Sequence, residues 1–175
     1  MSLAKDYARP TLVLTLICLV VTALLALTHQ ITQPIIEANN LRIAEESRAE
    51  VLAEADGFHE VKGEFPENTV DVYEADNGAG YAITVTSKGY DSTPLKVMIG
   101  IQADGAIEKV KVLSSNETPG LGSKVTEDSF TGQFAGMTSD GVDGMQMISG
   151  ATYSSKAMRA AVEQAFAIYE MVKGA

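Results

Sequence analysis

The sequence predicts an α+β fold: an N-terminal transmembrane helix and stalk helix, then a two-layer domain with an antiparallel sheet and a C-terminal helix. Three observations predict it: an uncharged apolar run near the N-terminus, alternating strand-like segments in the middle, and a helical apolar stripe at the end. The 175 residues suffice for one domain plus one further element. We expect residues 1–9 to be cytoplasmic, 10–31 to cross the membrane, 35–56 to form the stalk, and 57–175 to form an extracytoplasmic domain.

The segment Thr11–Thr28 contains 18 residues without a charge. With its flanks it reaches the ~20 residues that cross ~30 Å of hydrocarbon. Lys5 and Arg9 precede it and Glu37 is the first charge after it, which predicts a single-pass protein of the cell (inner) membrane with a cytoplasmic N-terminus. A cleaved signal peptide usually has an apolar core of ~7–15 residues and a small-x-small cleavage site. This run is longer, and no clean Ala-x-Ala follows it. A buried helix of a soluble protein would have polar residues among its apolar ones. We therefore expect an anchor that is retained in the lipid bilayer.

The region between the anchor and the domain is rich in helix formers. Residues 35–55 interleave apolar positions with Glu and Arg, which is typical of a solvated, partly amphipathic stalk helix. Pro34, just before it, is compatible with a bend at the membrane surface. Beyond Gly57 the pattern becomes strand-like. Four strands are expected, over residues 69–75, 80–90, 96–102 and 107–115.

The turns and the last helix complete the predicted domain. Asp104-Gly105 lies between two β-rich runs and is the best hairpin signal, while Phe130–Phe134 suggests a short helical turn. The final helix is expected from about Ser154 to Val172, with Ser154 or Ser155 as its N-cap. Its apolar stripe predicts helical cover on one face of the sheet.

Composition excludes several function classes. The net charge of −10 argues against nucleic acid, whose binding needs a positive surface. One cysteine, Cys18, permits no internal disulfide. His29 and His59 are far apart and lack metal-ligand spacing, so we expect no metal site and no histidine-based catalytic triad.

Residues 149–155 read SGATYSS and precede the final helix. A glycine-containing loop that enters a helix N-terminus favours an anion such as phosphate, because unpaired amides and the helix dipole point toward it. Taken alone, however, such a stretch is more often an ordinary capped helix without a ligand.

Residues 117–122 read ETPGLG. Two glycines and a proline let the backbone approach a flat partner, Leu121 offers an apolar edge, and Glu117 and Thr118 offer polar groups. Alone, this stretch is more often a turn-rich loop.

Together, the anchor, the strands, ETPGLGSK and SGATYSS, in this order and spacing, resemble a known family. This is the FMN-binding domain family, which includes the G subunit of the Rnf electron-transport complex and the C subunit of the sodium-translocating NADH:quinone reductase. The resemblance covers roughly Gly80 to the C-terminus plus the anchor. The short chain and the ETPGLGSK form are more similar to the G subunit of Rnf.

The resemblance implies FMN joined by a phosphoester to Thr152. It also implies a separate flavin transferase that uses FAD and a divalent metal and releases AMP. Further cofactor-binding residues are implied at Glu117, Thr118, Leu121, Gly122, Lys124, Ser149, Gly150 and Ala151. The family often has an aspartate where Gln146 stands, and the nearest aspartate here is Asp143.

The function implied by the resemblance is that of an electron-transfer subunit of a membrane-bound, ion-translocating ferredoxin:NAD⁺ oxidoreductase. The chain would relay electrons between redox centres of partner subunits and would be a carrier rather than a catalyst by itself. A tether suits a domain outside the cytoplasm, because it keeps a cofactor from being lost to the medium. Two alternatives are a stand-alone exported flavoprotein for extracellular electron transfer and a non-redox, membrane-anchored binding module in which SGATYSS only caps a helix.

Overall fold

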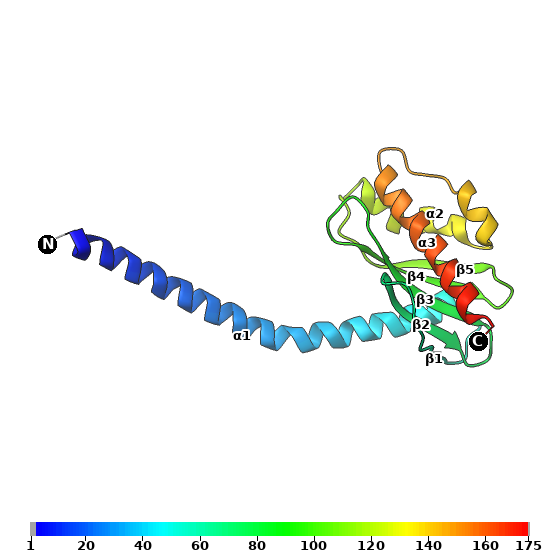
Figure 1. The fold of residues 1–175 in the computed structure, drawn as a ribbon, viewed down its shortest axis with the longest axis horizontal. Coiled ribbons are helices and arrows are strands. Elements are labelled where there is room, and N and C mark those ends of the chain that lie inside the picture. Colours follow the sequence, from blue (N-terminus) through cyan, green and yellow to red (C-terminus); the bar gives the residue numbers. More distant parts are fainter. Residues whose placement is uncertain (1–2, 175) are drawn as a thin grey trace. The chain divides into compact units, whose positions relative to one another are not determined.

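The computed structural model describes residues 3–174, which form one long helix, a five-stranded sheet, a series of short helices and a C-terminal helix (Figure 1). The chain divides after Arg42 into two units, which are described separately. The first unit belongs to helix α1 (Leu3–Val51). From Tyr7 onward, α1 includes an 18-residue window of mean hydropathy 2.6, none of it buried, and is long and apolar enough to cross a membrane.

Helix α1 is continuous, which differs from the expected separation into a membrane helix and a stalk helix. Pro10 and Pro34 both lie inside it. A proline inside a helix removes one backbone hydrogen bond. The turns on either side of Pro34 are helical, so α1 continues through this position. The helix ends at Val51, earlier than the expected residue 56, because the chain turns there into the domain core. The N–H of Ala53 donates to Glu108 Oε1 at 2.9 Å in place of a helical bond.

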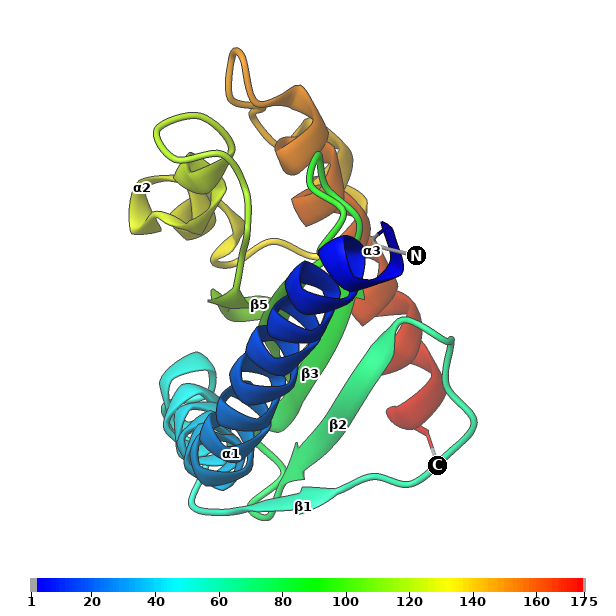
Figure 2. The same cartoon turned by 90° about the vertical axis from the view of Figure 1, so that its left-hand side faces the viewer.

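The sheet has the strand order β1-β2-β3-β4-β5, and every neighbouring pair is antiparallel. Figure 2 labels β1, β2, β3 and β5 of this sheet. The strands are β1 (Phe58–Glu60), β2 (Thr69–Ala75), β3 (Gly80–Ser87), β4 (Leu95–Gln102) and β5 (Ile107–Ser114). The antiparallel sheet predicted from the sequence is confirmed, and β1 is a fifth strand that was not predicted. Three residues are too short for an alternation signal. The hairpin at Asp104-Gly105 is confirmed, and Gly105 supplies the positive φ of 88°.

Helix α3 (Thr152–Val172) packs on one face of the sheet. Alternate residues of β3 and β4, such as Ile83 and Ile99, meet Met158 and Val162 of α3 in the main core. The opposite face is also covered, by the last turn of α1. There Val51 and Leu52 pack against a second cluster of strand residues, Ala82 and Met98. Helical cover was expected on one face only, and the sheet has it on both.

The segment between β5 and α3 contains four short helices. These are η1 (Gly122–Thr126), α2 (Asp128–Thr131), η2 (Gly132–Phe134) and η3 (Ser139–Gly144). The expected helical turn at Phe130–Phe134 is present as parts of α2 and η2. Buried Phe130 and Phe134 join the main core and hold this segment beside the N-terminal part of α3 (Figure 1).

Candidate functional site

A pocket of about 360 Å³ lies where three segments meet. The segments are the β3–β4 loop, the loop after β5 and the first turn of α3. The lining residues are Tyr90, Glu117, Thr118, Leu121, Gly122, Gly150, Ala151, Thr152, Tyr153 and Ser154. The two motifs singled out in the sequence, ETPGLG and SGATYSS, are therefore neighbours in space although about thirty residues separate them.

The ETPGLG segment folds as a tight turn closed by its own backbone. The carbonyl of Thr118 accepts hydrogen bonds from the N–H of Leu121 at 3.2 Å and from that of Ser123 at 3.1 Å. Ser123 Oγ accepts from the N–H of Gly120 at 2.9 Å. These bonds turn the chain into η1 and leave Leu121 half-exposed on the pocket wall.

The SGATYSS segment makes a turn and then begins α3. The carbonyl of Ile148 accepts from the N–H of Ala151 at 3.0 Å across a turn in which Gly150 has a φ of 82°. Thr152 is the first residue of α3 and is exposed to solvent. The first N–H groups of a helix have no intrahelical partner, so the pocket receives hydrogen-bond donors and the positive end of the helix dipole beside the Thr152 hydroxyl.

The N-cap predicted at Ser154 or Ser155 is wrong. The helix begins earlier, its N-cap residue is Ala151, and no side chain caps it. Both serines are buried and bond within the domain. Ser154 Oγ donates to Glu117 Oε2 at 2.5 Å, and Ser155 Oγ accepts from the N–H of Ile148 at 3.1 Å. The two serine hydroxyls thus bond the first turn of α3 to Glu117 and to Ile148, and neither of them caps the helix.

Glu117 is the buried charged group of the pocket, with 5% of its surface exposed. Its Oε1 accepts from the backbone N–H of Tyr90 at 3.0 Å, and its Oε2 accepts from Ser154. A single carboxylate therefore joins all three segments of the site.

Most of the site residues named from the sequence line this pocket, and two do not. Lys124 is exposed and lines a neighbouring pocket of about 280 Å³ together with Gln146. Ser149 is exposed in the turn before Gly150 and lies outside the first pocket. The backbone N–H of Gln146 donates to Gln133 Oε1 at 2.7 Å, which fixes the chain just upstream of the turn.

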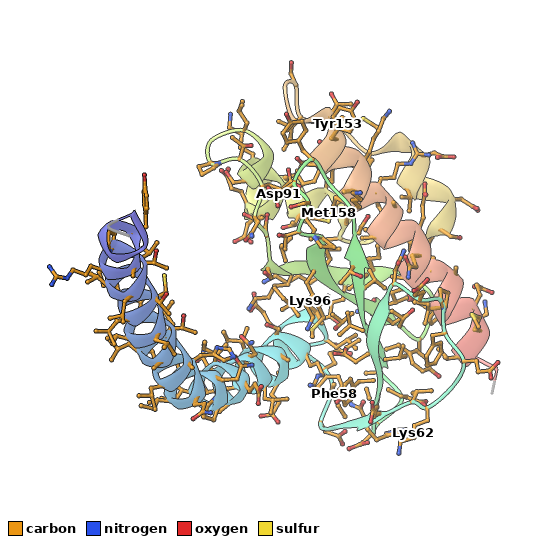
Figure 3. All side chains as sticks on the ribbon, turned by 60° about the vertical axis from the view of Figure 1, so that its left-hand side comes forward. Phe58, Lys62, Asp91, Lys96, Tyr153 and Met158 are labelled. Atoms are coloured by element: carbon orange, nitrogen blue, oxygen red, sulfur yellow. The ribbon has the colours of Figure 1, made fainter. Side chains whose placement is uncertain are left out.

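Two tyrosines that were not selected from the sequence stand at the pocket. Tyr90 and Tyr153 are 73% and 69% exposed, and their ring centroids are 6.1 Å apart with the rings tilted by 56°. Figure 3 shows Tyr153 at the end of the domain that also carries the loop with Asp91, whereas Met158 points into the core. Tyr153 is inside SGATYSS and could have been found there, but nothing local to Tyr90 signals its neighbour.

The apolar part of α1 fits a membrane anchor, and the α+β domain carries a pocket whose size suits a small-molecule cofactor. Residues 84–167 match the FMN-binding domain family, and residues 1–53 match the RnfG N-terminal region.

Curated relatives match over most of the chain. The G subunit of the Na(+)-translocating ferredoxin:NAD(+) oxidoreductase complex of Acetobacterium woodii is 35% identical, over 91% of this chain and 89% of its own length. The G subunit of the proton-translocating ferredoxin:NAD(+) oxidoreductase complex of Clostridium ljungdahlii is 29% identical, over 87% and 85%. The G subunit of the ion-translocating oxidoreductase complex of Methanosarcina acetivorans is 32% identical, over 94% and 95%. The chain belongs to the family of G subunits of the ion-translocating Rnf complexes, as the resemblance implied.

Proposed function

We propose that this chain is an electron-transfer subunit of an ion-translocating ferredoxin:NAD⁺ oxidoreductase and carries FMN in a phosphoester bond to Thr152. One observation carries the proposal: ETPGLG and SGATYSS form a single pocket with the exposed Thr152 in its lining. Family membership supports FMN as the cofactor and the other subunits of a membrane complex as partners.

The residues of the pocket suit the two ends of FMN. A volume of about 360 Å³ is within the ~300–1,000 Å³ of small-molecule sites. Leu121, Tyr90 and Tyr153 offer apolar and aromatic surface for a flat ring system. The Gly150 turn and the first N–H groups of α3 offer donors to a phosphate next to the Thr152 hydroxyl.

The attachment reaction balances without a redox change. Thr152 Oγ1 forms a bond to the FAD phosphorus on the riboflavin side, and the bond from that phosphorus to the bridging oxygen breaks. AMP leaves with that oxygen, and the hydroxyl proton passes to a base of the flavin transferase. Once bound, FMN supplies reversible electron transfer, while the chain holds it in place and shapes its surroundings.

The apolar part of α1 would anchor this carrier in the membrane. Positive residues before the apolar run favour a cytoplasmic N-terminus, which puts the domain from about residue 57 on the extracytoplasmic side of the cell membrane. Lipid and partner subunits would surround the exposed apolar face of α1. A tethered cofactor remains available in this location because it cannot diffuse away.

The test is Thr152→Val in the full-length protein, purified from its native host or from cells that also produce the transferase. Removing only the hydroxyl should abolish in-gel flavin fluorescence after acid denaturation. The peptide that contains Thr152 should lose the mass increment of one FMN less water. Circular dichroism should show a folded domain.

Thr138→Val is the matched control, because Thr138 is also an exposed threonine and lies outside this pocket. It should keep the covalent flavin. Fluorescence that persists in Thr152→Val would assign the phosphoester to another hydroxyl, and colourless wild-type protein would overturn the flavin proposal as a whole.

A further inference from the structure

We propose that Glu117 is a positioning residue that assembles the pocket from inside the protein. This role rests on the proposed function of the pocket. Glu117 holds the Thr152 turn and the Tyr90 loop in fixed positions relative to each other before any flavin is attached. From the sequence, Glu117 was expected among the groups that contact the cofactor. Its bonding in the structure points to a different use.

Both oxygens of the Glu117 carboxylate have partners within the protein. Oε1 accepts from the Tyr90 N–H at 3.0 Å and Oε2 accepts from Ser154 Oγ at 2.5 Å. With 5% of the residue exposed, replacement of these bonds by water is largely prevented. A buried acceptor that loses its donors is costly, so the two bonds hold their segments strongly.

The space around the carboxylate is closed by glycines on two sides. A Cβ added to Gly122 would lie 2.6 Å from Glu117 Oε2 and 2.7 Å from Ser154 Oγ. A Cβ added to Gly89 would collide with Glu117 Oε1. The backbone of both loops therefore lies directly against the carboxylate, and a shift of the side chain requires a shift of a loop.

The two bonds act on the parts of the site that the proposed function uses. Ser154 is in the first turn of α3, two positions after Thr152, so its bond to Glu117 orients the turn that presents the acceptor hydroxyl. Tyr90 is held through its N–H, and its ring meets that of Tyr153. Glu117 thereby fixes the acceptor and the aromatic side of the pocket together.

The first measurement uses full-length protein without flavin, produced without the transferase and kept in detergent. Hydrogen exchange of the Tyr90 amide is compared in wild type, Glu117→Leu and Glu117→Gln. Glu117→Leu should speed the exchange by about tenfold or more, because the amide loses its acceptor. Glu117→Gln should stay near wild type, since its side-chain oxygen can accept from Tyr90 and its NH₂ can donate to Ser154 Oγ.

The second measurement adds FAD, a divalent metal and transferase and follows the rate of covalent loading. Glu117→Leu should load about tenfold more slowly or worse, with Glu117→Gln rescued to within about threefold of wild type. Glu127→Leu is the matched control, because Glu127 is exposed and lines the neighbouring pocket. It should change neither measurement.

Three results would overturn the inference. The first is unchanged Tyr90 exchange in a folded Glu117→Leu protein that loads slowly, which would make Glu117 a cofactor contact. The second is normal loading despite faster exchange. The third is failure of Glu117→Gln to rescue.

A second variant covers the case in which Glu117→Leu does not fold. Ser154→Ala then replaces it and should slow loading by about threefold or more, because it removes one donor and leaves the carboxylate. Normal loading of folded Ser154→Ala would likewise overturn the inference. The hydrogen exchange of the Tyr90 amide tests the role of Glu117 in protein without flavin. The fluorescence of the wild-type protein tests flavin attachment, so failure of one proposal is distinguished from failure of the other.

Discussion

His59 shows how a single exposed residue can make the stability of this domain depend on pH. Its Nδ1 lies 2.7 Å from Asp76 Oδ1, and its Nε2 lies 3.5 Å from Glu74 Oε2. The hydrogen bond with Asp76 is the main cause that raises the pKa of His59 above its ordinary value, and the charge of Glu74 adds to it. The pair also ties β1 to the end of β2, at the edge of the sheet.

A raised pKa in the folded state stabilises the protein where the imidazole is protonated. The contribution is complete below the unfolded pKa of ~6.5 and is lost as the pH rises through the higher folded pKa. We expect His59→Gln to lower the melting temperature more at pH 6 than at pH 9, by a small amount because the pair is exposed. Thermal unfolding followed by circular dichroism measures this. In an Asp76→Asn background the pH dependence should shrink, and an equal effect of His59→Gln at both pH values would contradict the assignment.

At the scale of elements, the last turn of α1 is part of the folded domain. Glu50 accepts from Lys109 Nζ at 2.7 Å and also from Lys111, both on β5. The hydrogen bonds from these lysines lower the pKa of Glu50. The Arg48 guanidinium lies 3.8 Å from the centre of the Tyr73 ring on β2. Polar contacts therefore surround the apolar contact made by Val51 and Leu52.

Gly100 is the position at which this contact is closest. A Cβ on Gly100 would collide with the carbonyl oxygen of Val51, so the side-chain-free strand lets the end of α1 lie directly on β4. Gly100→Ala should lower the free energy of unfolding by about 1–3 kcal/mol, the usual cost of overpacking. Urea denaturation of the full-length protein in detergent measures it.

Gly132→Ala is the matched control for Gly100→Ala. Its backbone is helical, with a φ of −62°, and nothing lies within 4 Å of an added Cβ. It should leave the stability unchanged or raise it slightly. Equal effects of the two substitutions would show that α1 does not depend on the close approach at β4.

At the scale of the whole molecule, a helix that is long and apolar enough to cross a membrane and a folded domain share one chain. The boundary between the two units lies within α1, after Arg42. Residues 43–51 thus belong both to the helix that contains the apolar segment and to the compact domain.

Two shortened chains separate the membrane function of α1 from its structural function. A chain that begins at Ile43 should be released from membranes and stay folded, because it retains the buried Val51 and Leu52. A chain that begins at Ala53 should be less stable by about 3–6 kcal/mol, because each lost side chain contributes ~1.5–3 kcal/mol when fully buried. Membrane fractionation and urea denaturation measure the two effects. Equal stability of the two chains would contradict a structural role for the end of α1.

Local signals predicted much of the fold and part of the site. The alternation in residues 69–75 corresponds to β2, and the Asp104-Gly105 turn joins β4 to β5 as expected. Each depends on neighbouring residues only, through strand periodicity or a turn that needs positive φ. The pairing of ETPGLG with SGATYSS was inferred from a resemblance, and the pocket that both segments line brings them together in space.

Other features depend on residues that are distant in sequence. Ser154 looked like an N-cap because serine at a helix start usually is one, yet Glu117 takes its hydroxyl. Strand β1 exists because β2 offers it a partner at Phe58↔Ala75, and nothing in its three residues shows this. The contact of Tyr90 with Tyr153 likewise needs two loops to meet.

The sequence by itself determined the apolar run within α1, the strands β2 to β5 and the turn at Asp104-Gly105. All of these follow from hydrophobicity, periodicity and backbone conformation over a few residues. Tertiary structure alone decided where α1 ends, which face each helix covers and which groups surround Thr152. These outcomes depend on long-range burial and on the need of a buried carboxylate for donors, and no stretch of neighbouring residues contains that information.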